Sequence, residues 1–191
     1  SPPLKLEIKD LNIEGLADIE HISFSPSLIG FIIGRKVLNE VVLVKPEFTY
    51  EKLTLGAGEG AAAIKFPSAL KKLIVKRLTI KNGRLNFIDR SVGSEGIKIT
   101  LKDINFTLNN SYLFPRSVVT NFDLTGRIPW QDGQVEGRIA FSGWINLLKR
   151  DMKAILTIND IDGIYLYPYY SSWFDLDKAR IEKAKLNFRS N

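Results

Sequence analysis

The chain of 191 residues contains no cysteine, a single histidine and no long apolar run. The absence of cysteine excludes thiolate catalysis, zinc–thiolate sites and disulfide bonds. The one histidine, His21, cannot form a histidine-rich metal site, and we expect its side chain to lie at the surface. The longest apolar stretch, 28–34, is much shorter than the ~18 to 20 apolar residues with which a helix crosses a bilayer.

Patterns of catalytic residues are also missing. Acid–base and nucleophilic catalysis commonly use a histidine beside a serine, cysteine or carboxylate, and His21 has no such partner in the sequence. Two carboxylate pairs could bind a hard cation, but aspartates at this spacing are more typical of turns. These pairs are Asp160 with Asp162 and Asp175 with Asp177. We therefore predict a protein without enzymatic activity, with no catalytic residue, no metal site and no cofactor.

The charge balance does not predict nucleic-acid binding. The 27 Lys and Arg residues exceed the 21 Asp and Glu residues, but the net charge of +6 is spread along the chain. A nucleic-acid interface needs a basic face with interleaved aromatic rings. In the basic segment 73–88 the aromatic residue, Phe87, falls in the apolar phase of the pattern. Segment 56–60 (GAGEG) lacks the Lys-Ser/Thr of a phosphate-binding loop.

Alternation of apolar and polar residues dominates the sequence and predicts β-strands. Hydrophobic residues make up 45% of the chain, which is enough to bury a sizeable core. The expected strands are 4–16, 19–25, 36–53, 73–81, 84–91, 97–110, 117–128, 134–143, 152–159 and 181–189. The expected helical segments are 28–33, 67–72, 143–150 and part of 168–179, and 56–63 reads as a flexible loop.

Two local features, one dipeptide and one proline, add to this pattern. Asn82-Gly83 is the preferred turn of a two-residue β-hairpin, so we predict a hairpin between 73–81 and 84–91. Pro46 lies inside a long strand pattern and indicates an edge strand or a bulge. Strands and helices do not alternate, which favours antiparallel meanders over a parallel sheet. No Pro- or Gly-rich linker divides the chain, and we expect a single domain over residues 1–191.

The alternation changes phase within several strands. In 97-IKITLKDINFTLNN-110 the apolar positions switch parity at Lys102-Asp103, and 4-LKLEIKDLNI-13 does the same. Looser versions occur at 75-VKRLTI-80 and 154-AILTINDI-161. A one-residue slip exchanges the two faces of a strand, and a bulge restores the apolar residues to one face while bending the strand. Bulges repeated in several strands would curve the whole sheet.

Long strands with one apolar face need something to cover that face, and the expected helices are too short to do so. The pattern leaves three coverings open: a second sheet, closure into a barrel, or an apolar ligand or neighbouring domain in a trough. The aromatic run 165-YLYPYYSSWF-174 is either a small core under a loop or the mouth of an apolar site.

Three segments resemble, in order, the AsmA-like family of envelope proteins. These are 22-ISFSPSLIGFIIGRKVLNEVVLVKPEFTYE-51, then 73-LIVKRLTIKNGRLNFIDRS-91 with 97-IKITLKDINFTLNN-110, then 156-LTINDIDGIYLYPYYSS-172. The second carries a motif in Asn82, Gly83, Leu85, Phe87 and Asp89, followed by Leu101, Asp103, Ile104 and Phe106. The amino-terminal membrane helix typical of the family is not in this sequence, and we expect the chain to be a fragment of a larger membrane-anchored protein.

The resemblance implies a periplasmic module, anchored to the inner membrane outside this fragment, with a taco-like groove for phospholipid acyl chains. Its implied roles are lipid movement and outer-membrane biogenesis, with envelope proteins as further partners. We therefore predict an all-β, mainly antiparallel fold with long, bulged strands in a curved sheet and one or two short helices. The predicted lipid-binding residues are Phe24, Val44, Phe48, Leu85, Phe87, Ile99, Leu101, Phe106 and Leu108. The alternative is a β-sandwich domain of a cell-envelope protein that has a structural or protein-interaction role and binds no ligand.

Overall fold

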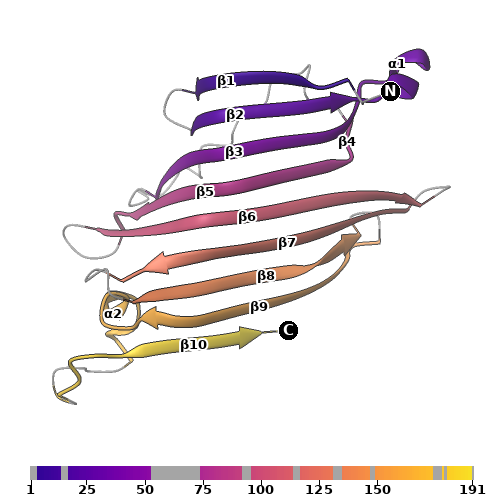
Figure 1. The fold of residues 1–191 in the computed structure, drawn as a ribbon. Coiled ribbons are helices and arrows are strands. Elements are labelled where there is room, and N and C mark those ends of the chain that lie inside the picture. The colour runs from indigo at the N-terminus through magenta and orange to yellow at the C-terminus, as the bar shows by residue number, and fades with distance from the viewer. Residues whose placement is uncertain are drawn as a thin grey trace.

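The described residues form one open, curved sheet of ten strands with two short helices (Figure 1). The computed structural model describes residues 4–13, 17–52, 74–91, 96–113, 117–130, 135–146, 149–173, 178 and 180–190. The strands are β1 (Leu6–Ile13), β2 (Ala17–Pro26), β3 (Val37–Lys52), β4 (Ile74–Val75), β5 (Arg77–Asp89), β6 (Ile97–Leu113), β7 (Ser117–Pro129), β8 (Glu136–Asn146), β9 (Asp151–Asp162) and β10 (Lys185–Ser190). The helices are α1 (Leu28–Ile32) and α2 (Tyr167–Tyr170).

The order of strands across the sheet is β1-β2-β3-β5-β6-β7-β8-β9-β10, with the two-residue β4 also paired to β3. Neighbouring strands are antiparallel, except that β3 pairs in parallel with β5 and with β4. The prediction of a mainly antiparallel, all-β fold with long strands is confirmed. The longest strand, β6, has 17 residues, which at ~3.3 Å each spans roughly 55 Å.

The predicted hairpin at Asn82-Gly83 is wrong. Both residues lie within the continuous strand β5, which pairs with β3 on one side and β6 on the other. Asn82 has the left-handed φ of 53° that a hairpin turn would also need, but here that angle forms a bulge. A Cβ on Gly83 would lie 2.9 Å from the Ile80 side chain, so the position favours glycine for its small size. Because the chain does not turn at Asn82-Gly83, residues on both sides of this dipeptide pair in parallel with β3.

Two other local predictions can be compared with the structure. The helix expected at 143–150 is wrong, because β8 continues to Asn146 and pairs with both β7 and β9. The helix expected at 28–33 is confirmed as α1. The loop at 56–63 and the helical turn at 67–72 lie outside the described residues.

Left-handed residues form a line across the sheet. Strands β1, β3, β5, β6 and β9 each contain one residue other than glycine with φ between 47° and 54°. These residues are Asp10, Lys45, Asn82, Asp103 and Asp160. The residues that precede them are connected through strand pairing, from Lys9 through His21 and Val44 to Lys81, and from Lys102 through Arg127 and Arg138 to Asn159.

The phase breaks in the sequence occur on this line. In β6, Leu101 pairs with Leu85 and Ile104 with Gly83, so the apolar side changes parity across Lys102-Asp103 with a register shift. The predicted bulge there is confirmed, and Asp10 and Asp160 mark the predicted breaks at 4–13 and 154–161. The fourth stretch, 75–80, differs, because the chain bends at Lys76 between β4 and β5 and the phase changes later, at Asn82.

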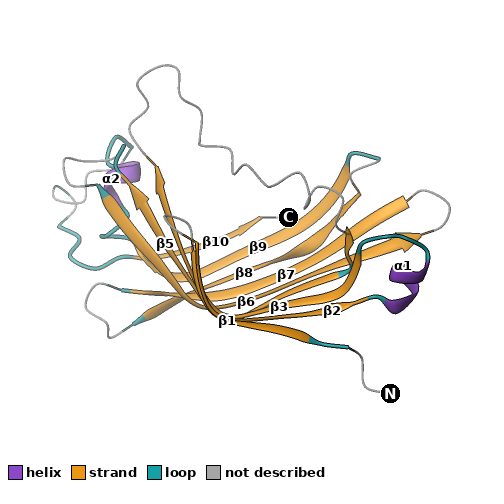
Figure 2. Ribbon diagram, turned by 90° about the horizontal axis from the view of Figure 1, so that it is seen from above, coloured by secondary structure: helices purple, strands orange, loops and turns teal. Residues whose placement is uncertain are grey.

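Strands β7 and β8 cross the same line without changing parity and carry glycine there instead. Gly126 and Gly137 are both buried, and Gly126 pairs with Ile139. A Cβ on Gly137 would lie 2.9 Å from the carbonyl oxygen of Asp160, whereas a Cβ on Gly126 would meet nothing closer than 3.4 Å. Bulges and glycines together bend the sheet along one line, and Figure 2 shows the resulting trough from above.

Candidate functional site

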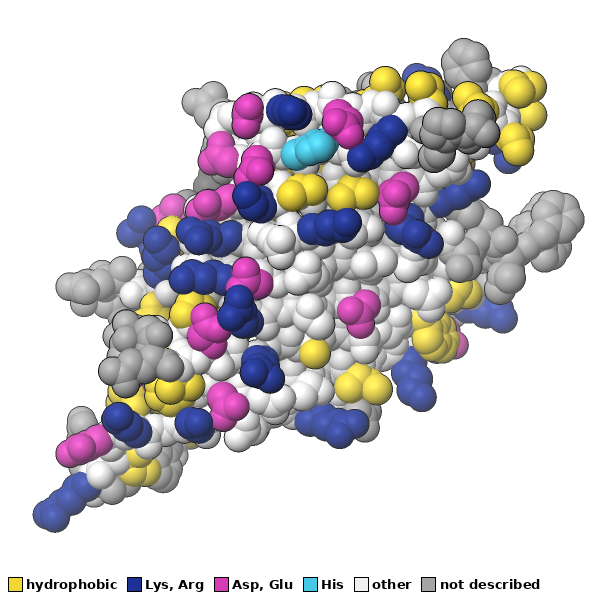
Figure 3. All heavy atoms as spheres, viewed as in Figure 1, with side chains coloured by type: hydrophobic (Ala, Val, Ile, Leu, Met, Phe, Trp, Pro, Cys, Tyr) yellow, Lys and Arg dark blue, Asp and Glu magenta, His cyan; other side chains and the backbone are white. Residues whose placement is uncertain are grey.

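The two faces of the bent sheet differ in chemistry. The convex face, shown in Figure 3, carries Lys, Arg, Asp, Glu and the only histidine, His21. The concave face carries the apolar residues that alternate with them. In β7 the convex Asp123, Thr125 and Arg127 are exposed, while the concave Phe122 and Leu124 are half-buried. The candidate site is therefore the concave face, which we call the groove.

Eight of the nine residues predicted from sequence lie together on the groove. Strand pairing joins Phe48 to Leu85, Leu85 to Leu101, and Phe87 to Ile99. It also joins Phe106 to Ile80, Leu108 to Leu78, and Phe24 to Val41. Paired residues share a face of a sheet, so these side chains form one continuous apolar surface on β2, β3, β5 and β6.

The ninth residue, Val44, lies on the opposite face, and its assignment to the groove is wrong. Val44 pairs with His21 on β2 and with Lys81 on β5, both of which lie on the convex face. Val44 and Phe48 have the same parity in the sequence, but Lys45 adopts a φ of 47° between them. That bulge exchanges the faces, so parity alone misplaces every residue on the far side of it.

The groove extends further than the sequence interpretation proposed. Its other half is formed by Phe122, Leu124, Phe141, Leu156, Ile158 and Ile161 on β7, β8 and β9. These residues show the same alternation as the predicted set, so the signal was present in the sequence. What could not be read was that β7 to β9 continue the same sheet, since a second sheet would show an identical pattern.

Within the described residues no second layer of structure covers the groove. Only six apolar side chains in this part of the chain are buried: Ala17, Ile19, Pro46, Ile97, Ile104 and Ile161. The eight predicted residues that lie on the groove all remain partly accessible. At the sheet edges the exposure is greater, with 44% for Ile8 on β1 and 53% for Phe188 on β10. Among the alternatives for covering the apolar face, a closed sandwich or barrel is not what these residues form.

A defined cleft of ≈ 220 Å³ lies in the groove where β9 and β10 meet residues 163–173, which include α2 and which we call the α2 segment. Its walls are mostly aliphatic, and the polar groups of Asp162 and Tyr165 are part of its lining. The apolar walls include Ile99, Ile128, Ile158, Ile161, Leu166 and Phe188. This combination of apolar walls and few polar groups is typical of a site for an apolar ligand.

The α2 segment closes one end of the groove through Tyr165. Strand β7 stops pairing with β6 at Arg127 and ends at Pro129, which has no N–H to donate. The exposed backbone edge of β6 beyond that point is occupied by Tyr165, whose hydroxyl accepts from the N–H of Lys98 (3.0 Å) and donates to the Lys98 carbonyl. The tyrosine side chain thus replaces the missing strand partner.

A second tyrosine of this segment contacts a buried carboxylate on the groove face. Asp89, the last residue of β5, is only 1% exposed. It accepts from the Ser91 hydroxyl and N–H, from Lys52 Nζ (3.0 Å) and from the Tyr169 hydroxyl (3.1 Å). These donors, with Ser91 first, hold the pKa of Asp89 well below its ordinary value. Burial, reinforced by the bond to Asp89, raises the pKa of Tyr169 to about 12.

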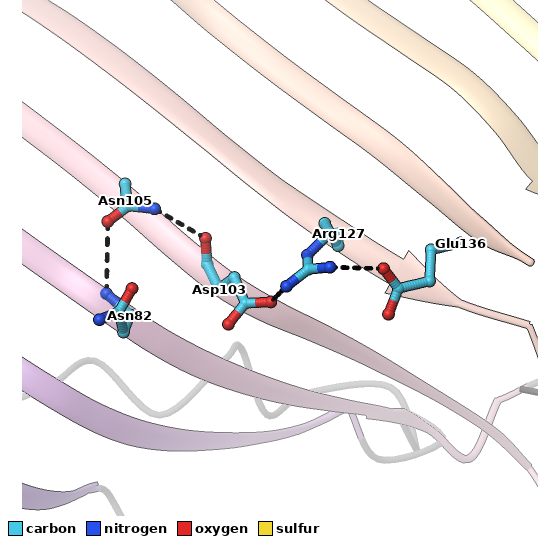
Figure 4. A network of polar contacts seen from close by, with 5 residues as sticks. All are labelled: Asn82, Asp103, Asn105, Arg127 and Glu136. Carbon is cyan, nitrogen blue, oxygen red and sulfur yellow. Dashed lines mark hydrogen bonds and ion pairs between the residues drawn. The ribbon is translucent and has the colours of Figure 1, made fainter.

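The convex face opposite the groove carries a polar network on the bulge line (Figure 4). The amide of Asn105 accepts from the backbone N–H of Asn82 (3.4 Å) and donates to the carbonyl of Asp103 (3.0 Å). The guanidinium of Arg127 pairs with Asp103 and with Glu136 (2.7 Å). Bulges leave backbone groups without ladder partners, and this network supplies partners at the bulges of β5 and β6.

The other residues singled out from sequence have structural roles. Asp160 is the bulge residue of β9, and its carboxylate lies 3.4 Å from Lys185 Nζ. Asp162 accepts from the N–H of Tyr165 and so fixes the turn into α2. Within the described residues no cluster of three His, Cys, Asp or Glu side chains could hold a metal ion. Asp175 and Asp177 lie outside those residues.

Comparisons of the chain with models of protein families, with curated proteins and with solved structures found no match. No helix among the described residues combines the length and apolar character required to cross a membrane. The AsmA-like resemblance therefore remains an interpretation of the sequence motifs.

Proposed function

We propose that the groove binds acyl chains of phospholipids and that the chain is an AsmA-like module of a cell envelope. The observation that carries the proposal is the apolar face, which no second layer of the described residues covers and which bulges on one line bend into a trough. Each methylene group transferred from water to an apolar surface contributes ~0.8 kcal/mol, so a trough of this kind needs no polar chemistry to hold a lipid tail. The module acts without catalysis, in the periplasm, with its anchor outside this fragment.

The polar features of the groove support a lipid rather than a wholly apolar ligand. The aliphatic cleft near α2 ends at Asp162 and Tyr165, and Lys52 reaches the groove at its rim with its side chain 46% exposed. A headgroup can remain in water at this rim while its tails lie along the trough. The motif residues of the resemblance, Asn82-Gly83 and Asp103, are bulge residues, and the bulges are what shape the trough.

The test compares Phe106→Asp with Thr107→Asp, which are neighbours on β6 with opposite faces. Native mass spectrometry with lipid extraction should find phospholipid on the unmodified chain and on Thr107→Asp. Phe106→Asp should retain the strand content in circular dichroism but lose most of the lipid, because a carboxylate in the trough would have to give up its water. Binding of a fluorescent fatty acid should fall in parallel.

Two outcomes would contradict the proposal. Unfolding of Phe106→Asp, with Thr107→Asp intact, would mean that this face is a sealed core. Absence of lipid from the unmodified chain, together with no binding of the fluorescent fatty acid, would favour a ligand-free interaction domain. That alternative is supported by the edge strands β1 and β10, each of which pairs on one side only among the described residues.

A further inference from the structure

Four aliphatic side chains in and directly after the helix α1 face solvent, whereas its smallest residue faces the protein. Leu28 is 61% exposed, Ile29 74%, Ile32 81% and the following Ile33 59%. Gly30 is buried, and a Cβ there would lie 3.0 Å from the Val37 side chain at the start of β3. A helix of a soluble domain normally buries its apolar stripe, so this arrangement is reversed.

The local structure holds α1 in this orientation. The Ser27 hydroxyl accepts from the N–H of Gly30 (3.1 Å), which caps the start of the helix. At its end Gly34 adopts a φ of 70°, and the N–H of Arg35 donates to the carbonyl of Gly30 (2.8 Å). The isoleucines are therefore displayed on a capped turn that is anchored to β2 and β3.

The same end of the sheet is basic. Arg35 and Lys36 directly follow α1, and Lys149, Arg150 and Lys153 lie at the turn from β8 to β9, at the same end in Figure 1. All five are exposed, and among the described residues none of them pairs with a carboxylate. Of the carboxylates at this end, Glu7 and Glu40 are paired with Lys5 and Arg77. A third, Asp151, is the exposed first residue of β9 and lies between Arg150 and Lys153 in the sequence, so cations still outnumber carboxylates at this turn.

We infer that this end of the sheet docks on an anionic phospholipid surface, into which α1 inserts its leucine and isoleucine side chains. Apolar side chains flanked by cations are the combination that binds the interface of an anionic membrane. Four aliphatic side chains within six residues make a small projection rather than the broad, complementary patch of a protein interface. The inference deepens the proposed function by naming the membrane contact of the groove, but it depends on different residues.

The experiment uses the absence of cysteine, which makes single-site labelling specific. Ile29→Cys and, as the matched control, Trp173→Cys are labelled with a polarity-sensitive dye. Trp173 is 86% exposed at the α2 end. Vesicles of phosphatidylcholine with phosphatidylglycerol should increase and blue-shift the signal at position 29 and leave that at position 173 nearly unchanged. Vesicles of phosphatidylcholine alone should have a weaker effect, and salt should reduce binding.

A second measurement separates insertion from lipid uptake. In flotation assays Ile29→Ser/Ile32→Ser should lower the affinity for anionic vesicles by roughly tenfold or more, yet bind a soluble fluorescent fatty acid as the unmodified chain does. Equal dye responses at both positions, or unchanged flotation of the double variant, would overturn the inference. So would self-association that the double variant abolishes, because α1 would then contact a second copy. If the unmodified chain floats with anionic vesicles but does not bind the fluorescent fatty acid, the proposed function is refuted while the present inference stands.

Discussion

The two ends of the groove are built in opposite ways. At the α2 end, Tyr165 and Tyr169 cross over the sheet and bond to β6 and β5, so aromatic side chains seal the groove from within. At the α1 end, four aliphatic side chains face solvent, and five cations at the same end of the sheet pair with no carboxylate among the described residues. Among the described residues the exposed apolar side chains are therefore of two kinds, because some line the groove while others form a projection.

The consequences for stability follow from this difference. Substitutions at the α2 end remove buried or edge-satisfying contacts and should destabilise the fold. Substitutions at α1 remove side chains that touch little protein and should alter only what the molecule binds.

The largest loss is expected for Asp89→Asn. The substitution keeps the shape but removes the charge that Lys52 and the Ser91 and Tyr169 hydroxyls are arranged around. The amide NH₂ of the new asparagine is itself a donor, so it would face one of these donors without forming a hydrogen bond. The thermal midpoint should fall more than in any other variant proposed here, and limited proteolysis should begin within 163–173. Lys98→Gln, an exposed position at the same end, is the control and should change neither measurement.

The same contact predicts a pH dependence with two limits. Because the pKa of Asp89 is lowered by folding, its stabilisation is complete above the ordinary value of 3.8 and is lost as the pH falls below it. Because the pKa of Tyr169 is raised from 10.0 to about 12, its contribution is present below pH 10 and is lost between these values. Urea denaturation across pH should show the acid loss in the parent chain and not in Asp89→Asn.

On the bulge line between the two ends, two neighbouring glycines should respond differently to alanine. Gly137→Ala should cost about 1 to 3 kcal/mol, because the new methyl group meets a backbone oxygen that cannot move aside. Gly126→Ala should be nearly neutral, since its nearest contact would be 3.4 Å away. Chemical denaturation of the two variants gives the comparison. Equal losses would show that the fit at Gly137 is not the reason for its glycine.

A smaller effect is expected for Tyr165→Phe, which removes both bonds to the backbone of Lys98 but keeps the ring in the aliphatic cleft. The exposed edge of β6 can then bond to water, so the loss should be about 1 kcal/mol. Hydrogen exchange should report it locally, with faster exchange at the Lys98 amide and unchanged protection in β8. Tyr167→Phe is the matched control, since it leaves that edge of β6 intact.

The smallest effect on stability is expected for Ile29→Ser/Ile32→Ser, which removes two side chains that are 74% and 81% exposed. Exposed substitutions usually change stability by no more than about 0.5 kcal/mol. The denaturation midpoint should therefore match that of the parent chain. A large loss would show that α1 packs against the protein in solution, and would remove the contrast between the two ends.

Most of the strands, and the phase breaks of β1, β6 and β9, could be read from the sequence alone. Those properties are local: side chains alternate along a strand, and Asn or Asp tolerates the left-handed angle of a bulge. Eight of the nine predicted residues lie on the groove, and those on β6 do so because the phase break at Lys102-Asp103 is visible in the sequence. Val44 was misplaced because residues 41–44 are all apolar, so the sequence shows no alternation from which the bulge at Lys45 could be recognised.

The way in which the strands pair could be seen only in three dimensions. Asn82-Gly83 suits a hairpin turn and a bulge equally well, because both need the same backbone angle, and the choice depends on whether β3 lies alongside. Alternation likewise reads the same in a sandwich and in a single bent sheet, since it records that one face is apolar and not what lies opposite. The alignment of the bulges into one line, the tyrosines across the α2 end and the outward isoleucines of α1 all depend on contacts between residues far apart in the chain.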